Sequence, residues 1–149
     1  IKKMKILMTK YNYFLILLIS FLLVISVHAA EVKIDSAIIK LPRPGQNVTA
    51  GFMRLESSET LLIKKISSEY IDNIEIHSME RQDGVMKMRK MLRPMVSPKN
   101  PLILKHGGNH LMLFGVNKDL KIEGEISIVF EFEKNNGEII SKNFTFTTN

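Results

Sequence analysis

The sequence predicts an all-β domain, built as a β-sandwich or a Greek-key barrel. Apolar and polar residues alternate in short runs, and Gly, Pro and Asn residues separate these runs. No stretch of helical length carries apolar residues at every third or fourth position. Alternation with a period of two, frequent turn residues and a missing helical stripe are together typical of antiparallel sheets with one buried face.

The start of the chain is expected to precede this domain. Lysines at the beginning are followed by the apolar run "FLILLISFLLVISV" at residues 14–27, and then by Ala29 and Ala30. A basic start, a short apolar stretch and small residues behind it are the pattern of a cleavable export signal. We therefore expect a signal peptide over residues 1–29, which is the only part to meet a membrane, and one domain over residues 30–149.

Five strands are predicted in the first half of the domain. "VKIDSAIIKL" ends at the turn formed by residues 42–45, and "AGFMRLE" places Met53 and Leu55 on one face, where they are candidates for the core. Three further alternating runs follow, at residues 61–67, 73–79 and 85–91.

Four more strands are predicted in the second half. "LILK" and "HLMLFGV" are short apolar runs separated by a loop with two glycines, Gly107 and Gly108. "EISIVFEFE" has the most regular alternation and is followed by the turn Asn135-Asn136-Gly137, which predicts a hairpin with "EIISKNFTFTT". The residues of the first of these strands that are expected to face inward are Ile126, Ile128, Phe130 and Phe132.

Composition excludes several classes of function. The net charge of +6 comes mostly from four leader lysines, because 17 basic residues face 15 acidic ones without them, and this balance gives no reason to expect nucleic-acid binding. The chain has no cysteine, so it has neither a disulfide nor a thiolate. It also lacks a nucleophile-base motif and a phosphate-binding glycine loop, so we expect no enzyme activity. The acidic residues expected in turns or on outward positions are Glu80, Asp83, Glu131 and Glu133.

Histidines and methionines gather between residues 77 and 112. His110 and Met112 are two residues apart on a predicted strand and therefore share a face, while His77 faces away from the apolar Ile76. Imidazole and thioether ligands suit Cu(I), whereas structural zinc prefers thiolates, and calcium and magnesium prefer oxygen ligands. These residue types favour a copper site, with core packing as the alternative for the methionines.

The spacing of four of these residues carries a resemblance. His77 and Met88 are separated by ten residues, Met88 and His110 by twenty-one, and His110-Leu-Met112 completes the pattern. The segments "DGVMKMR" and "GGNHLML" around it match as well, and the sequence resembles the periplasmic copper chaperones that assist assembly of the binuclear CuA centre of cytochrome c oxidase. The resemblance extends from about Val32 to the end of the chain.

That resemblance implies a cupredoxin-like β-sandwich in the periplasm. It implies one Cu(I) ion bound by His77, Met88, His110 and Met112, and a copper-accepting partner such as the CuA subunit of the oxidase or its assembly factors. A blue-copper electron carrier is excluded, because such a site needs a cysteine ligand. We further expect Phe114 to shield the metal from water, and the protein to be a monomer.

Residues outside the four-residue pattern have more than one interpretation. His106 is expected in a loop, with a supporting role rather than as a ligand. Met91 and Met95 could form a weaker copper site with Met79 or Met86, or they could be an exposed docking surface, which we favour. Two other functions stay open for the whole protein. One is a copper buffer without a dedicated acceptor, and the other is a β-sandwich interaction module that binds no metal.

Overall fold

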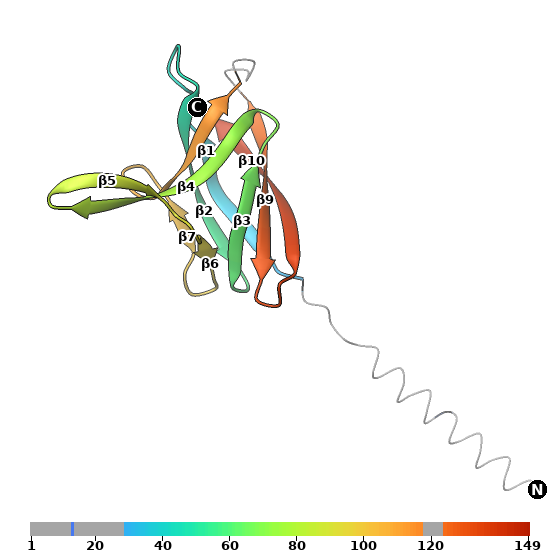
Figure 1. Ribbon diagram of the computed structural model, residues 1–149. Coiled ribbons are helices and arrows are strands. Elements are labelled where there is room, and N and C mark those ends of the chain that lie inside the picture. The colour runs from blue at the N-terminus through green and yellow to red at the C-terminus, as the bar shows by residue number, and fades with distance from the viewer. Residues whose placement is uncertain (1–12, 14–28, 118–123) are drawn as a thin grey trace, which may run out of the picture.

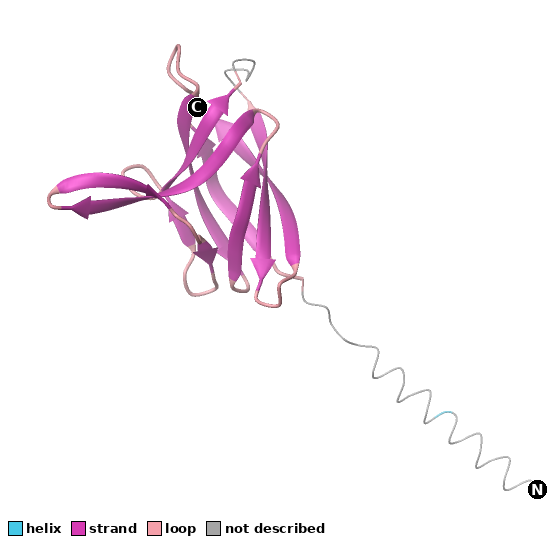
Figure 2. Cartoon of the chain, in the orientation of Figure 1, coloured by secondary structure: helices cyan, strands magenta, loops and turns pink. Residues whose placement is uncertain are grey.

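The computed structural model describes residue 13 and residues 29–117 and 124–149. Residues 29–117 and 124–149 form strands, turns and loops, with no helix among them (Figures 1 and 2). In the described part of the chain, no helix is long and apolar enough to cross a bilayer. The strands are β1 (Val32–Ile39), β2 (Val48–Ser57), β3 (Leu61–Ser67), β4 (Ile71–Gln82), β5 (Val85–Lys90), β6 (Met95–Val96), β7 (Leu102–Leu104), β8 (His110–Val116), β9 (Glu125–Lys134) and β10 (Ile139–Thr148).

One curled sheet contains all ten strands, in the order β5-β4-β8-β2-β1-β10-β9-β3-β6, with β7 paired to β2 beside this path. The β1–β10 pair is parallel, and the other named pairs are antiparallel. Strands β3 and β4 come into contact although they are not neighbours in the sheet order, so the sheet folds over and encloses a core (Figure 1). The predicted all-β sandwich is therefore confirmed.

Alternation along the strands places the core where the sequence predicts it. All four inward residues of β9 are buried, and two of their rings, Phe130 and Phe132, stack with centroids 5.9 Å apart. Met53 and Leu55 of β2 are buried as well. Burial of each such side chain contributes about 1.5–3 kcal/mol to the stability of the fold, and with no cysteine in the chain the domain depends on this core.

The turns follow the sequence signals closely. Gly45 and Gly137 both have positive φ, of 79° and 84°, in the two turns that were predicted from their Pro and Asn residues. The Gly137 N–H donates to the Lys134 carbonyl oxygen at 2.9 Å and closes the β9–β10 hairpin. One strand, β6, was not predicted, because two residues are too few to show an alternating pattern.

Strand β4 extends beyond the body of the sandwich. Its residues 71–77 pair with β8, while residues 78–82 pair only with β5 among the named strands. The β4–β5 hairpin therefore projects from the domain as a two-stranded arm (Figure 1), and all six residues of β5 are exposed. The expected signal peptide lies outside the described residues except for Tyr13 and Ala29.

Candidate metal centre

Two predicted ligands, His77 and His110, lie directly opposite each other on the neighbouring strands β4 and β8. Their ring centroids are 6.0 Å apart. The next pair in the register, Ile76 and Leu111, points the other way and is buried in the core. The buried apolar pair next to the histidines thus fixes the strand register, and this register holds both imidazoles on the same side of the sheet.

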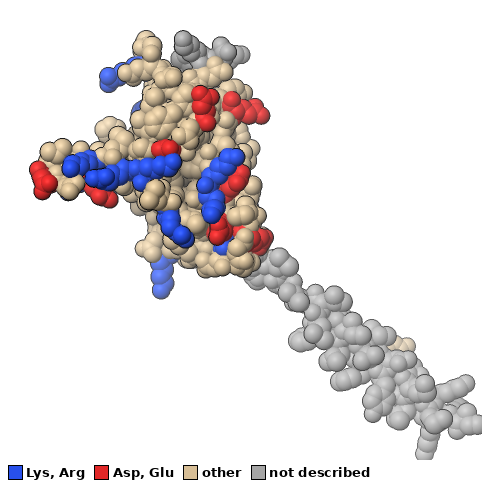
Figure 3. Space-filling view, in the orientation of Figure 1, with Lys and Arg blue, Asp and Glu red and all other residues tan. Residues whose placement is uncertain are grey.

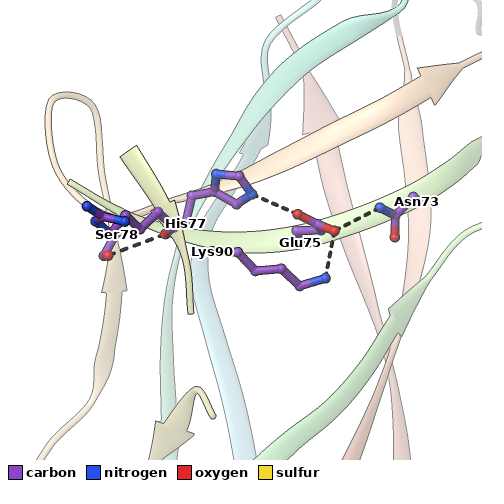
Figure 4. A network of polar contacts seen from close by, with 6 residues as sticks. Asn73, Glu75, His77, Ser78 and Lys90 are labelled. Atoms are coloured by element: carbon purple, nitrogen blue, oxygen red, sulfur yellow. Dashed lines mark hydrogen bonds and ion pairs between the residues drawn. The ribbon is translucent and has the colours of Figure 1, made fainter. Parts of the chain in front are cut away.

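Each of these imidazoles has one nitrogen held by a hydrogen bond. His110 Nδ1 lies 3.0 Å from the carbonyl oxygen of Gly108, which only accepts, so Nδ1 carries the proton and Nε2 keeps its lone pair. His77 Nε2 lies 2.8 Å from a carboxylate oxygen of Glu75, so in the neutral ring the proton is on Nε2 and the lone pair is on Nδ1 (Figure 4). That Nδ1 atom is buried and has no hydrogen-bond partner among the described residues.

Three of the four predicted ligands line one pocket. Met88, His110 and Met112 border a space of about 610 Å³, which is also lined by residues 45–50. His110 is only 8% exposed and Met112 is half-buried, whereas Met88 on the projecting arm is 48% exposed. His77 is not part of the pocket lining, but its ring lies beside that of His110. The donors therefore lie at the edge between the core and solvent.

Glu75 organises the polar contacts around His77. One of its oxygens accepts from His77, and the other accepts from Lys90 Nζ at 2.7 Å and from Asn73 Nδ2 at 3.1 Å (Figure 4). The hydrogen bond from Lys90, followed by that from His77, lowers the pKa of Glu75 from its ordinary value of 4.5 to about 2. Glu75 is therefore a carboxylate at neutral pH, and it orients the His77 ring.

Lys90 also connects the arm to the body of the sheet. It belongs to β5, the strand that carries Met88, while Glu75 belongs to β4, the strand that carries His77. The ion pair between Lys90 and Glu75 thus links the strands of two predicted ligands at the base of the arm. Sequence reasoning missed Glu75, although a carboxylate two residues before His77 on a strand was a signal that the two side chains share a face.

Strand β8 and the loop before it also contribute ring contacts. The ring of Phe114 lies 6.3 Å from the ring of His77, in keeping with its expected shielding role. His106 lies in the loop as predicted, with its ring 6.1 Å from the ring of Phe52. Gly107 in the same loop has a φ of 72°, so a glycine is suited to the tight turn into β8.

The remaining methionines and carboxylates fall into distinct environments. Met91 is half-buried against the core, and Met95 is half-exposed on β6, so these two do not belong to the β4–β5 arm. Glu133 pairs with Lys64 on the surface at 2.8 Å. Glu80 and Asp83 are on the arm, at or near its tip, where Asp83 is exposed.

Carboxylates do not supply a metal site here. Among residue 13 and residues 29–117 and 124–149, no three His, Asp or Glu side chains gather in a way that could hold a metal ion. A metal at the His77–His110 pair would therefore need further ligands from the neighbouring thioethers. A mixed set of imidazoles and thioethers selects a soft ion rather than calcium, magnesium or structural zinc.

Comparisons with known proteins place this arrangement in context. Residues 32–141 match the family described as "Putative lipoprotein LpqE-like". Protein RP573 of Rickettsia prowazekii (strain Madrid E) is 36% identical over 77 residues, which are 51% of this chain and 42% of that protein. The chain thus matches less than half the length of this curated relative.

Solved structures share the fold at low sequence identity. The copper-bound PCuAC domain from PmoF2 superposes with a TM-score of 0.60 at 14% identity, over 82% of this chain and 97% of that one. Cu(I)-DR1885 from Deinococcus radiodurans superposes with a TM-score of 0.51 at 21% identity, over 83% of this chain and 78% of that one. These likenesses show that the chain has the fold of PCuAC domains.

Proposed function

Because the chain belongs to the LpqE-like family and has the fold of PCuAC domains, we propose that it is an exported protein that binds one Cu(I) ion and passes it to a copper-accepting protein. The proposed ligands are His77, Met88, His110 and Met112. The two solved structures described above, of the PmoF2 domain and of DR1885, are both of copper-bound proteins, in agreement with this proposal.

One observation carries the copper site. The buried Nδ1 atom of His77 has a lone pair and no hydrogen-bond partner among the described residues, and it belongs to a ring beside His110. A buried polar atom without a partner costs about 1–3 kcal/mol, so such an atom usually contacts a water molecule, an ion or another polar group in the working protein. Metal coordination would satisfy it, while Glu75 holds the proton on the other nitrogen.

The ligand chemistry fits a soft monovalent ion. Two neutral imidazoles and two thioethers suit Cu(I), because thioether sulfur is soft and both ligand types are uncharged. A carboxylate that accepts from the other nitrogen of His77 makes that ring a better donor. Phe114 beside the ring lowers the local polarity, which further favours Cu(I) over the more strongly hydrated Cu(II).

Release of the ion follows from the uneven burial of the ligands. His110 is buried, whereas about half of the Met88 side chain is exposed on the arm. An acceptor can therefore replace Met88 first and the buried ligands afterwards, by stepwise ligand exchange. The proposed acceptor is a cuproenzyme under assembly, such as the CuA subunit of cytochrome c oxidase or one of its assembly factors.

X-ray absorption on the purified protein loaded with Cu(I) tests the site directly. We expect a first shell of about two nitrogen and two sulfur scatterers, as four ligands of these types would give. Absence of stoichiometric copper, or a shell of nitrogen and oxygen alone, would overturn the proposal and favour an interaction module without metal. His106→Ala is the matched control, because it removes a histidine outside the proposed set and should leave the spectrum unchanged.

The phenotype of a deletion strain distinguishes copper delivery from copper buffering. If the protein delivers copper to the oxidase, deletion should lower oxidase activity at low copper, and added copper should restore it. If the protein buffers copper without a dedicated acceptor, deletion should instead cause sensitivity to excess copper with normal oxidase activity. Complementation with a Met88→Ala variant, compared with wild type, then links either phenotype to the site.

A further inference from the structure

The projecting arm carries a second group of thioethers. Met79 on β4 lies directly opposite Met88 on β5. Met86 is on the same strand as Met88, two residues before it. Residues opposite each other in an antiparallel pair, and residues two apart along a strand, share a face. We propose that Met79, Met86 and Met88 form an outer Cu(I) site on the arm, where the ion is held before it reaches, or after it leaves, the inner ligands.

The geometry of the arm allows three sulfur atoms to meet. Opposite residues in an antiparallel pair have Cβ atoms about 4.5–5.5 Å apart, and diagonal neighbours are about 7–8 Å apart. Methionine has three rotatable bonds in its side chain and can span such gaps. Two strands without further neighbours also leave the side chains room to adjust, since β4 beyond residue 77 pairs only with β5 among the named strands.

Packing does not account for Met86 and Met88. Met86 and Met88 are 45% and 48% exposed, and both lie on a strand whose residues are all exposed, away from the buried core. Apolar side chains on a projecting two-stranded arm gain little burial and add a surface on which other molecules can bind. By contrast, Met53 is buried in the core and Met91 packs against it.

Charge on the arm favours a soft monovalent ion over a divalent one. Lys87 and Arg89 alternate with the methionines along β5, and basic side chains run along the arm in Figure 3. Arg81 lies opposite Met86 in the register, on the thioether face. These positive charges disfavour a divalent cation more than a monovalent one, and hard cations prefer carboxylate oxygens, which the three thioethers do not provide.

Met88 connects the outer group to the inner site. It lies opposite Met79 on the arm and also lines the pocket that contains His110 and Met112. The transfer step, which rests on the proposed function, is a ligand exchange at constant Cu(I) oxidation state. The bonds to Met79 and Met86 break as bonds to His77, His110 and Met112 form, while the Met88 sulfur stays bound. No electron or proton needs to move, because thioethers and neutral imidazoles bind without deprotonation.

Methyl NMR with Ag(I), a redox-inert substitute for Cu(I), tests the outer site. In wild-type protein labelled at the methionine methyl carbons, a first equivalent of Ag(I) should shift Met88 and Met112. A second equivalent should shift Met79 and Met86, the two thioethers of the outer site that are still free when Met88 is bound at the inner site. The Met95 methyl is the internal control and should not move. If the Met79 and Met86 methyls stay in place throughout the titration, the outer site is wrong.

Two sets of variants separate the outer site from the inner one. In His77→Ala/His110→Ala, the ion should still shift Met79, Met86 and Met88, which would support the outer site even if the inner site proved wrong. In Met79→Leu/Met86→Leu, the first equivalent should bind as in wild type and the second should be lost, with Met95→Leu as the matched control. Loading from a Cu(I)–chelator complex should also be slower in that double variant; an unchanged loading rate would overturn the transfer role.

Discussion

His77 on β4 and His110 on β8 face each other across one strand pair, with their ring centroids 6.0 Å apart. Each ring has one nitrogen fixed by a hydrogen bond, to Glu75 in one case and to the Gly108 carbonyl in the other. The protein therefore sets both tautomers before any ion arrives. Such preorganisation lowers the cost of binding, because neither ring has to change its protonated nitrogen.

Removal of single ligands is expected to weaken Cu(I) binding. His110→Ala and Met88→Ala should each lower the affinity by an order of magnitude or more, since an outer-shell change alone typically costs about 10–100-fold. Competition against a Cu(I) chelator measures this effect, and circular dichroism checks that the fold persists. His106→Ala and Met95→Leu are matched controls of the same residue types. Unchanged affinity in Met88→Ala or His110→Ala would remove that residue from the ligand set.

Glu75 is expected to act through His77. Glu75→Ala removes the acceptor that holds the proton on Nε2, so part of the population should move its proton to Nδ1 and Cu(I) affinity should fall by about 10–100-fold. Nitrogen NMR of the copper-free protein measures the tautomer directly. Glu75→Gln is the conservative variant, because its amide oxygen can still accept from Nε2, and it should keep most of the affinity. If Glu75→Ala leaves the His77 tautomer unchanged, Glu75 has no positioning role.

The lowered pKa of Glu75 predicts a pH dependence of stability. Folding lowers this pKa from 4.5 to about 2, so the carboxylate stabilises the folded state fully above about pH 4.5. This contribution is lost as the pH falls toward 2. Urea unfolding of the copper-free protein should therefore show a steeper loss of stability over this interval in wild type than in Glu75→Gln, which cannot titrate. Parallel pH profiles for the two proteins would contradict the assignment.

Gly115 is expected to be intolerant of a side chain. Its φ is +66°, and a Cβ atom there would collide with the side chain of Asp72 on β4. Gly115→Ala should lower the free energy of unfolding by roughly 2 kcal/mol or more, from backbone strain and the collision together. Gly137→Ala has a similar φ of +84° but open space around it, and it should cost less. Equal losses in the two variants would show that the contact with Asp72 does not matter.

Much of the fold was accessible from the sequence, because burial leaves a period of two. In β9 every second residue is buried, so the pattern identified both the strand and its inward face. Glycine and asparagine then marked the turns, since these residues tolerate positive φ. The pairing of β1 with β10 could not be predicted, because a parallel contact between distant segments leaves no local signal.

The candidate site was predicted in its residue types but not in its supporting contacts. Spacing placed His110 and Met112 on one face, whereas the position of His77 opposite His110 is seen only in the strand register of the structure. The pairing of Lys90 with Glu75 was missed, because it depends on how β5 folds back on β4. The projection of the arm was missed for a similar reason, since β4 looks like one uniform strand in the sequence.

The parallel pair of β1 and β10 has a consequence for the order of folding. Ile38 and Ile39 pair with Thr147 and Thr148, so the first strand of the domain gains its second neighbour only from the last. Because the chain is synthesised from its N-terminus, one edge of β1 has no pairing strand until β10 has been made. Contacts between such distant segments slow folding. Loss of residues 139–148 would leave an unpaired edge on both β1 and β9, which invites association with other chains.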